Sequence, residues 1–311
     1  MNIYGGQAVI EGVMFAGRSV NVTAVRRKND EIAFLEVPKK EISWLRTLKK
    51  IPFLRGLVAI IESSAKGAQH LNFSAEQFAE DEDGDGAANK EEEKPSLTSR
   101  LSLILGVAVV GVLSFVFGKL IFTIVPAVIE QLLFSNQWSN QGAGRILHNL
   151  VEGVIKILFL VIYIYIISLT PVIKRLFQYH GAEHKVISAY EAGVELTVPN
   201  VQKFSTLHYR CGSSFIILTV LIGVVIYSFL HYDNLWERVI QRVILLPVVI
   251  GVSYEALRAT NALRDIPILR YLGYPGLWLQ KLTTKEPLDE QVEVSIASFN
   301  RMRELDTQLT K

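Results

Sequence analysis

The segment LFLVIYIYIISLTPVIKRLFQYHGAEHK, residues 158–185, decides what kind of fold this sequence adopts. It joins a nearly continuous apolar run to a polar stretch that holds two histidines and a glutamate. The apolar run extends from about Leu150 to Val172, which is long enough for a helix to cross a bilayer. The sequence therefore predicts a membrane-spanning helix with a candidate site for chemistry directly after it.

The composition agrees with a membrane protein. The 311 residues are 50% hydrophobic and the mean hydropathy is positive, which is too apolar for an ordinary soluble domain of this size. The formal net charge is only +2, and the basic residues lie beside apolar runs, so we expect no nucleic-acid partner. A single cysteine excludes an internal disulfide, and the N-terminus has no pattern of a cleaved signal peptide.

Three other apolar segments accompany the Leu150–Val172 run, at about residues 101–129, 214–230 and 239–257. We therefore expect a polytopic α-helical membrane protein with about four transmembrane helices in residues 100–273, and a cytoplasmic helix and loop at 174–212 within that region. Basic residues concentrate before the first span, after the second and after the fourth. The positive-inside rule then places both termini and the histidine segment in the cytoplasm, with the lipid bilayer as a partner.

Residues 1–43 predict a small β-rich cytoplasmic cap. Apolar residues alternate from Val20 to Ala24 and again from Ile32, on either side of a turn at Asn29-Asp30, which indicates a hairpin. Glycines at positions 5, 6 and 12 indicate tight turns or close backbone approaches. Glu11, which lies among them, is either a remote ligand or a carboxylate on the solvent face of a strand.

The remaining segments flank the predicted membrane domain. Residues 44–79 form a basic amphipathic stretch that Pro52 kinks or divides, and that lies on the inner leaflet or covers a soluble core. Residues 80–99 predict an acidic, disordered linker. Residues 274–311 begin with a short amphipathic segment, where Trp278 is an interfacial anchor or a packing residue. A helix over Leu288–Leu305 should follow and dock on the cap, with Asp289 and Glu290 in its first turn.

The polar stretch contains the pattern of a metal site. On a helix, His180 and His184 project from one face, so that two ring nitrogens can reach one cation. Together with Glu183 they have the order His-x-x-Glu-His, in which two histidines hold zinc and the glutamate is the general base. Glu191 lies on the same stripe two turns beyond His184, roughly 11 Å along the axis, and is one candidate for a third ligand.

Further candidate residues lie at the same predicted membrane face. Arg210 and Cys211 precede the third span, where the arginine could lower the pKa of the thiol and let it act as a nucleophile or ligand, or stabilise an oxyanion. The thiol is alternatively a small buried residue. Glu255, at the end of the fourth span, is either a third ligand or acid, or the ion-pair partner of Arg258 one turn away.

Motifs spread over almost the whole chain resemble the YqhQ-like family of bacterial inner-membrane proteins, a family of unknown function whose members are described as predicted metal-dependent enzymes. The motifs are GGQAVIEGVM (5–14), PFLRG (52–56), HGAEHK (180–185), YEAG (190–193), RCGSSF (210–215), SYE (253–255) and PGLWLQKLTTKEP (275–287). The resemblance implies a bacterial cytoplasmic-membrane location but no particular reaction. It implies functional roles for residues within these motifs: His180, Glu183, His184, Glu191, Arg210, Cys211 and Glu255.

Three functions are compatible with these patterns. The first is a divalent-metal hydrolase, with zinc or a similar ion, that acts on peptide or lipid-linked bonds at the inner leaflet. The second is a non-catalytic membrane factor that receives a partner such as the protein-insertion or translocation machinery. A small transporter is the third, and it is disfavoured because the ionisable residues of the spans, such as Glu152 and Arg242, lie within reach of a span end.

Overall fold

The computed structural model describes residues 4–39, 43–83, 118, 121–134, 142–209, 211–232, 234–263 and 266–309. The chain divides into two compact units, which are described separately. We call the first the sheet unit; it comprises Met1–Asp83, Tyr163–Thr219 and Pro247–Lys311. The second, the helical unit, comprises Gly84–Ile162 and Val220–Leu246. The part of the predicted acidic linker that follows Asp83 lies outside the described residues, and so does Arg210.

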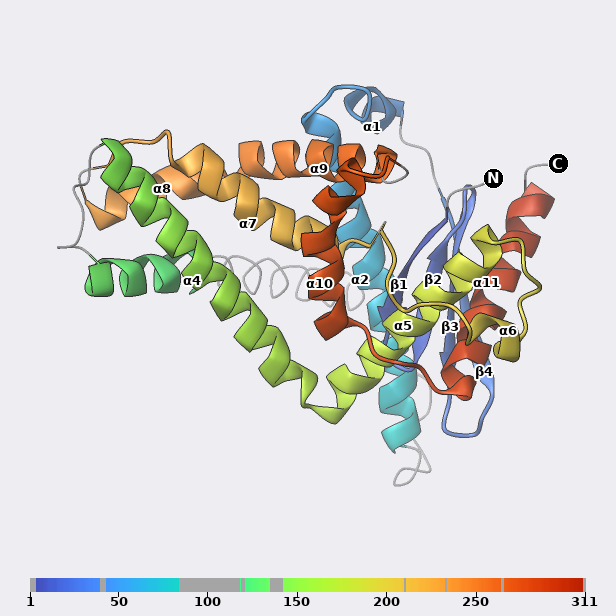
Figure 1. Ribbon diagram of the computed structural model, residues 1–311. Helices are drawn as coiled ribbons and strands as arrows, with labels where there is room; N and C mark the ends of the chain where they lie inside the picture. Colours follow the sequence, from blue (N-terminus) through green and yellow to red (C-terminus); the bar gives the residue numbers. More distant parts are fainter. Residues whose placement is uncertain are drawn as a thin grey trace, which may run out of the picture. The chain divides into compact units, whose positions relative to one another are not determined.

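Four antiparallel strands form a meander at the start of the sheet unit (Figure 1). They are β1 (Gly5–Val9), β2 (Gly12–Ala16), β3 (Val20–Arg26) and β4 (Ile32–Pro38). Ala24 of β3 pairs with Phe34 of β4, and Asp30 in the intervening turn has a positive φ of 64°. The predicted hairpin is thereby confirmed.

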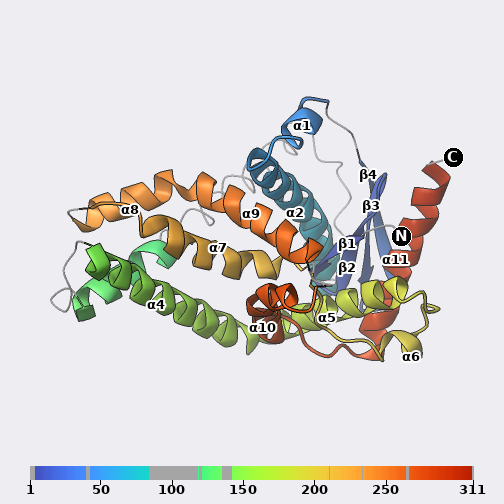
Figure 2. The same cartoon turned by 45° about the horizontal axis from the view of Figure 1, so that its top comes forward.

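Helices cover both faces of this sheet, as Figure 2 shows. Val22 and Ala24 lie in the core formed with α5 (Pro171–Glu191) and α11 (Asp289–Leu309). Thr23, which points to the opposite face because side chains alternate along a strand, contacts His70 of α2 through a 2.6 Å hydrogen bond. α2 thus packs on the sheet. Of the two alternatives for the amphipathic stretch, the inner leaflet or a protein core, this side of α2 follows the second.

The amphipathic stretch is divided near Pro52, as predicted. α1 (Ser43–Leu48) and α2 (Leu54–Asp83) are separated by a turn in which Phe53 has a φ of 65°. The prediction of disorder from residue 80 is wrong for its first residues, because α2 continues to Asp83. Arg27 and the Lys28 amide bind the Asp81 carboxylate there, which ties this end of the helix to the turn between β3 and β4.

The core of the sheet unit lies between β2, β3, α5 and α11, and its largest side chains include Tyr179, Phe15, Phe299 and Met302. Tyr4, Phe15 and Tyr190 all make edge-on ring contacts with Phe299. The predicted C-terminal helix and its docking on the cap are confirmed, since Val292, Val294 and Phe299 of α11 are buried in this core.

The rest of the sheet unit is helical. It contains α6 (Val198–Val201), α9 (Leu246–Ala262, from Pro247), the 3₁₀ helix η1 (Leu269–Gly273) and α10 (Tyr274–Thr283). The helix of the histidine motif is continuous through Gly181. A methyl carbon there would lie only 2.1 Å from the Lys285 carbonyl oxygen, so the glycine lets the segment after α10 run against α5.

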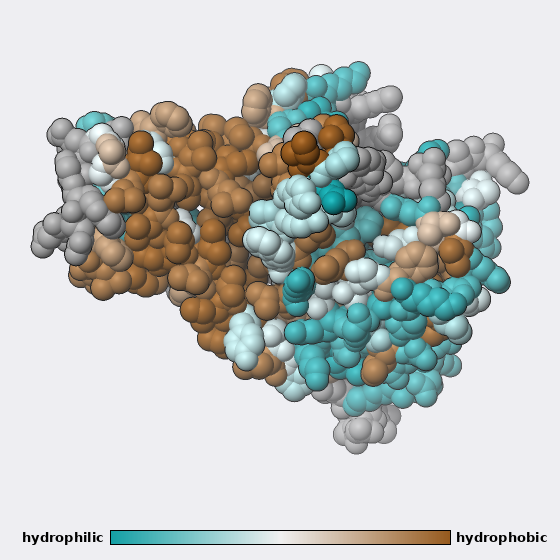
Figure 3. All heavy atoms as spheres, viewed as in Figure 1, coloured by the Kyte–Doolittle hydropathy of each residue, from teal (hydrophilic) through white to brown (hydrophobic). Residues whose placement is uncertain are grey.

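Three apolar helices and the amphipathic α8 make up the helical elements of the described part of the helical unit. They are Ile121–Phe134, most of α4 (Gly142–Ser168), the second half of α7 (Ser213–Tyr227) and α8 (Leu235–Ile244). Among the described residues, α4 is the one helix that by itself is long and apolar enough to cross a membrane. Only 17% of its most apolar window is buried, and its apolar side chains form a brown surface in Figure 3.

The four predicted spans agree with the helices of the structure to different extents. α4 begins eight residues before the predicted Leu150–Val172 span. It ends earlier than that span because the helix stops before Pro171, where α5 starts. α7 is apolar but shorter than a span, and the fourth segment is broken at Leu245 into α8 and α9, which meet the length criterion only as one bent pair. The first span lies mostly outside the described residues, so the number of spans stays a prediction.

A buried ionic network joins the elements of the helical unit. Arg238 binds the carboxylates of Glu130 and Glu152, and Arg242 binds Glu152. His148 contacts the other oxygen of Glu130. Glu152 and Arg242, which the sequence places separately near span ends, pair with each other here. A network of this kind holds Ile121–Phe134, α4 and α8 together.

Candidate metal centre

Two histidines of α5 and the single cysteine converge in the sheet unit. His180 and His184 are one turn apart on α5, and Cys211 lies in the loop just before α7. One ligand atom from each of the three lies within 4.8 Å of the others. The Nε2 atom of His180 is 3.2 Å from the Cys211 sulfur. These three residues are the one described group of metal-ligating type with this convergence.

Backbone carbonyls fix both imidazole rings. His180 donates from Nδ1 to the Thr283 carbonyl at 2.8 Å, and His184 donates from Nδ1 to the Thr206 carbonyl at 2.5 Å. Because a carbonyl oxygen can only accept, the proton of each neutral ring is on Nδ1 and the lone pair is on Nε2. Burial also holds the pKa of His184 well below its usual value, so that ring is neutral. Metal-binding histidines are oriented in this way.

Cys211 is buried and is held from two sides. Its sulfur is 3.2 Å from His180 Nε2 and 3.0 Å from the Ser213 hydroxyl. Burial raises the pKa of the thiol, which is opposite to the lowering expected from Arg210. The thiol therefore keeps its proton and donates it to the His180 lone pair. A cation that binds both atoms would replace this proton, since metal coordination deprotonates a thiol.

The spacing of these atoms suits a tetrahedral ion. With Zn–N of about 2.0 Å and Zn–S of about 2.3 Å, tetrahedral ligands N and S are roughly 3.5 Å apart. The observed 3.2 Å between His180 Nε2 and Cys211 Sγ is close to this value. Two nitrogens and one sulfur fill three positions of a tetrahedron and leave the fourth for water or substrate.

Glu183 lies beside this group on the next face of α5. It is buried, and burial raises its pKa to about 8; Cys211 adds to the rise, whereas His180 and the Gly6 amide oppose it. A methyl carbon on Gly6 would lie 2.9 Å from the Glu183 side chain. The glycine of β1 therefore leaves the room in which this carboxyl group sits, which confirms the close backbone approach expected at that position.

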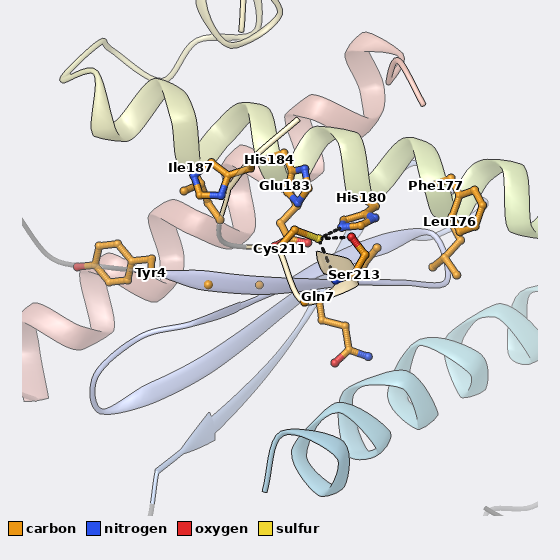
Figure 4. Close-up of a pocket in the computed structure, with 15 residues that line it drawn as sticks. Tyr4, Gln7, Leu176, Phe177, His180, Glu183, His184, Ile187, Cys211 and Ser213 are labelled. Atoms are coloured by element: carbon orange, nitrogen blue, oxygen red, sulfur yellow. Dashed lines mark hydrogen bonds between the residues drawn. The ribbon is translucent and has the colours of Figure 1, made fainter. Parts of the chain in front are cut away.

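A cavity of about 320 Å³ opens at the centre (Figure 4). His180, Glu183, His184 and Cys211 line it, together with residues of β1. In Figure 4 the three candidate ligands come from above the strand, while Gln7 points away from them toward α2. The arrangement thus leaves open space next to the candidate ligands.

Two predicted ligands are placed elsewhere. Glu191, at the end of α5, has its carboxylate 3.7 Å from Nε2 of His208, whose ring packs near that of His184. Glu255 is bound by both ends of the Arg55 guanidinium, at 2.7 Å for Nε, and by the Phe53 amide. Arg55 is thus the main partner of Glu255 rather than Arg258, and it holds the pKa of that carboxyl below its usual value.

Glu11 is neither a ligand nor a free carboxylate on a strand. It sits in the turn between β1 and β2 with a φ of 52°. Arg175 of α5 binds both of its oxygens, each at 2.5 Å, and the Tyr179 hydroxyl donates to it at 3.3 Å. Glu11 therefore ties the first hairpin to the helix that carries the histidines.

Sequence reasoning missed the groups that support the site. Thr206 and Thr283 act through their backbone carbonyls, which no sequence pattern reveals. Gln280 binds both the amide and the carbonyl of His208 and so fixes the loop before Cys211. The sequence signal for Gln280 was its position inside the long 275–287 motif. The structure adds that this glutamine is buried, and a buried glutamine needs polar partners.

Comparison with known proteins identifies relatives. Residues 51–305 match the family described as "Protein of unknown function (DUF1385)". A protein of Bacillus subtilis (strain 168) described as "Uncharacterized protein YqhQ" is 53% identical over 306 residues, which cover 97% of this chain and 93% of that protein. No solved structure matches. The resemblance inferred from the motifs is confirmed, although neither description names a metal, a reaction or a location.

Proposed function

We propose that this chain, which belongs to the family of proteins of unknown function DUF1385, binds a divalent metal ion and uses it for hydrolysis at a membrane surface. The observation that carries the proposal is the convergence of His180, His184 and Cys211, with both Nδ1 protons held by backbone carbonyls. Such a site has its nitrogen lone pairs pre-oriented, so little ordering is needed when an ion binds.

The donor set favours zinc among the common divalent ions. Two neutral imidazoles and one thiolate are borderline to soft ligands, which suit zinc better than magnesium or calcium. When bound, such an ion polarises a carbonyl or phosphoryl oxygen and lowers the pKa of a coordinated water. The open fourth position and the cavity of about 320 Å³ provide the room for a substrate group.

Glu183 has the position of a general base. It lines the same cavity as the three candidate ligands and lies between His180 and His184 along α5. In the order His-x-x-Glu-His, the carboxylate accepts a proton from water while the histidines hold the ion. Gly6 supports this role because any larger residue would displace the carboxyl group.

Membrane association is part of the same proposal. α4 exposes apolar side chains along its length, among them Val154, Leu158 and Ile162, as a helix in lipid does. Trp278 of α10 is 64% exposed, which favours its role as an interfacial anchor. The lysines and arginines that flank the predicted spans would place the site at the cytoplasmic face by the positive-inside rule. The proposed substrate is a peptide or lipid-linked bond at the inner leaflet.

A non-catalytic membrane factor is the second candidate. The observation in its favour is that both histidines bond to protein groups, so the same contacts could tie α5 to the Cys211 loop and to α10. Its partner would be the protein-insertion or translocation machinery. The open cavity favours the hydrolase over this alternative, because a purely structural joint would be filled.

Elemental analysis of the detergent-purified protein tests the metal site. We expect about one equivalent of zinc, manganese or iron in the parent and in a control His231→Ala, which changes an exposed histidine of the helical unit. The double variant His180→Ala/His184→Ala should contain none. A thermal melt shows whether each variant is folded. A parent that holds no metal after purification without chelator and subsequent exposure to zinc would contradict the proposal.

A further inference from the structure

A second cavity of the sheet unit, of about 530 Å³, has several basic side chains in its lining. Five cationic side chains border it: Lys39, Lys49, Arg55, Lys66 and Arg258. They come from four separate parts of the chain, namely the end of β4, the turn after α1, α2 and α9. Glu62 is the one acidic residue among the described residues of the lining. Cations brought together from such distant positions indicate a site rather than a charged stretch of sequence.

The carboxylates near the cavity in the described part of the chain do not balance this charge. Glu62 is shared by Lys49 and Lys66, and Glu255, outside the lining, binds Arg55. Asp306 also acts electrostatically on Lys39. Among the described residues, five cationic groups therefore face three carboxylates, which leaves a surplus of two positive charges. The cavity therefore has a positive potential that an anion would lower.

The pKa of Lys39 reflects burial and the repulsion between these cationic groups. Burial and the charge of Lys66 lower the pKa of its ammonium group, which donates to the Gly17 carbonyl. Like charges held together in a partly buried cavity repel one another unless a counter-charge lies between them. The chain nevertheless holds them in place, since α2 and α9 pack so closely that a methyl carbon on Gly56 would lie 2.6 Å from Tyr254.

We propose that this cavity binds a phosphate-type oxyanion, either the phosphate of an anionic lipid headgroup or that of a soluble phosphorylated compound. A guanidinium and several ammonium groups are the donors that recognise phosphate. The volume lies in the range of ligand sites. Gly5 and Gly6 of β1 also line the cavity.

The position of the cavity is compatible with both sources. Arg258 belongs to α9, which is part of the apolar bent pair, and basic groups at the end of an apolar helix bind anionic headgroups. Gly5, Gly6 and Gln7 line both this cavity and the one at the histidine cluster. The inference does not depend on the metal, because the cationic residues and the three candidate ligands are different side chains.

Native mass spectrometry in a nonionic detergent tests the proposal with three probes: inorganic phosphate, phosphatidylglycerol and phosphatidylcholine. The test variant is Lys39→Gln/Lys66→Gln. The control is Lys28→Gln/Lys203→Gln, which removes two lysines exposed elsewhere in the sheet unit. Since the test variant loses two charged hydrogen-bond donors, it should bind at least about tenfold more weakly. The control should bind as the parent does.

The probes separate the two sources. Binding of inorganic phosphate that the test variant loses supports a soluble phosphorylated ligand. A one-to-one adduct with phosphatidylglycerol but not phosphatidylcholine, lost in the same variant, supports a lipid headgroup. Equal binding by parent, test variant and control, or no binding of either anion to the parent, would overturn the proposal. If the double variant does not melt cooperatively, Arg258→Gln replaces it.

The same assay on His180→Ala/His184→Ala keeps the two proposals apart. This variant should lose metal and retain the anion adduct, because none of the five cationic residues is changed. Loss of both in a folded protein would show that the anion is held through the metal instead.

Discussion

Gly181→Ala is the substitution whose outcome depends most directly on the packing around the candidate metal centre. Gly181 lies in the middle of α5, between the two histidines. In an exposed helix this change stabilises by about 0.8–1 kcal/mol, because alanine has the higher helix propensity. Propensity alone therefore predicts a protein that is more stable and has the same site.

The structure predicts the opposite sign. The new methyl carbon would lie 2.1 Å from the Lys285 carbonyl oxygen and 3.2 Å from Thr206 Cγ2. The first contact is more than an ångström too short, so the backbone near Lys285 has to move and its 2.9 Å hydrogen bond to the Phe177 carbonyl is lost. Overpacking costs about 1–3 kcal/mol and the hydrogen bond about 1 kcal/mol. After subtraction of the propensity gain, the net loss is about 2 kcal/mol.

Two measurements check this expectation. For a unit of this size, about 2 kcal/mol corresponds to a fall in Tm of roughly 4–8 °C in a thermal melt. Thr206 and Thr283, whose carbonyls orient the histidines, lie at and next to the displaced segment. Competition with a chromogenic chelator should therefore show zinc affinity weaker by about 10–100-fold, as for loss of other outer partners.

Gly212→Ala is the matched control. It lies next to Cys211, but a methyl carbon there has no atom within 4 Å, so Tm and zinc affinity should stay near those of the parent, within about 0.5 kcal/mol. If Gly181→Ala melts higher than the parent and binds zinc equally well, the close packing of α5 on the segment after α10 is wrong.

Further expectations concern Glu183, the carboxylate of Glu255, the buried ionic network and the core of the sheet unit. Glu183→Gln should keep about one equivalent of metal but lose hydrolytic activity on any substrate that a hydrolase screen identifies. In the metal-free protein the pKa of Glu183 is raised to about 8, so its contribution to stability is present below its unfolded pKa and is lost as pH rises through about 8. Melts of the parent between pH 5 and 9 should show this loss relative to Glu183→Gln, and parallel pH profiles would refute it. Glu255→Gln should leave the metal content unchanged in elemental analysis, because Arg55 rather than a metal binds that carboxylate; loss of metal would return Glu255 to the candidate ligands. Arg242→Gln should destabilise by about 3–5 kcal/mol in a denaturation melt, because it leaves Glu152 partly unpaired in a buried network; a change below about 1 kcal/mol would mean that the network is solvated. Phe299→Ala should cost about 3–5 kcal/mol by the same measurement, because the ring is fully buried between sheet and helix, and a loss below about 1 kcal/mol would show that it is not part of the core.

Local patterns in the sequence determined much of the sheet unit. Alternation on either side of Asn29-Asp30 identified the β3–β4 hairpin, Pro52 marked the break between α1 and α2, and acidic residues at Asp289 marked the start of α11. Each of these features is encoded within a few neighbouring residues. Such signals depend on backbone geometry that repeats over 2 or about 3.6 residues, so they can be read without knowing the fold.

The sequence also indicated part of the candidate centre. The four-residue spacing of His180 and His184 fixed their common face as soon as α5 was predicted. It could not choose a third ligand among Glu191, Cys211 and Glu255. Glu191 is on the right stripe but too far along the axis, and it lies beside His208 instead.

Only the tertiary structure decided which candidate residue lies beside the two histidines and which side chains form the second cavity. Cys211 reaches His180 because the chain after α5 turns back through α6 and a loop that Gln280 holds. Glu255 is drawn to Arg55, 200 residues away in sequence, and the cations of the second cavity come from four separate segments. These outcomes depend on where loops bring distant segments together, and loop paths follow from the packing of the whole chain rather than from any local periodicity.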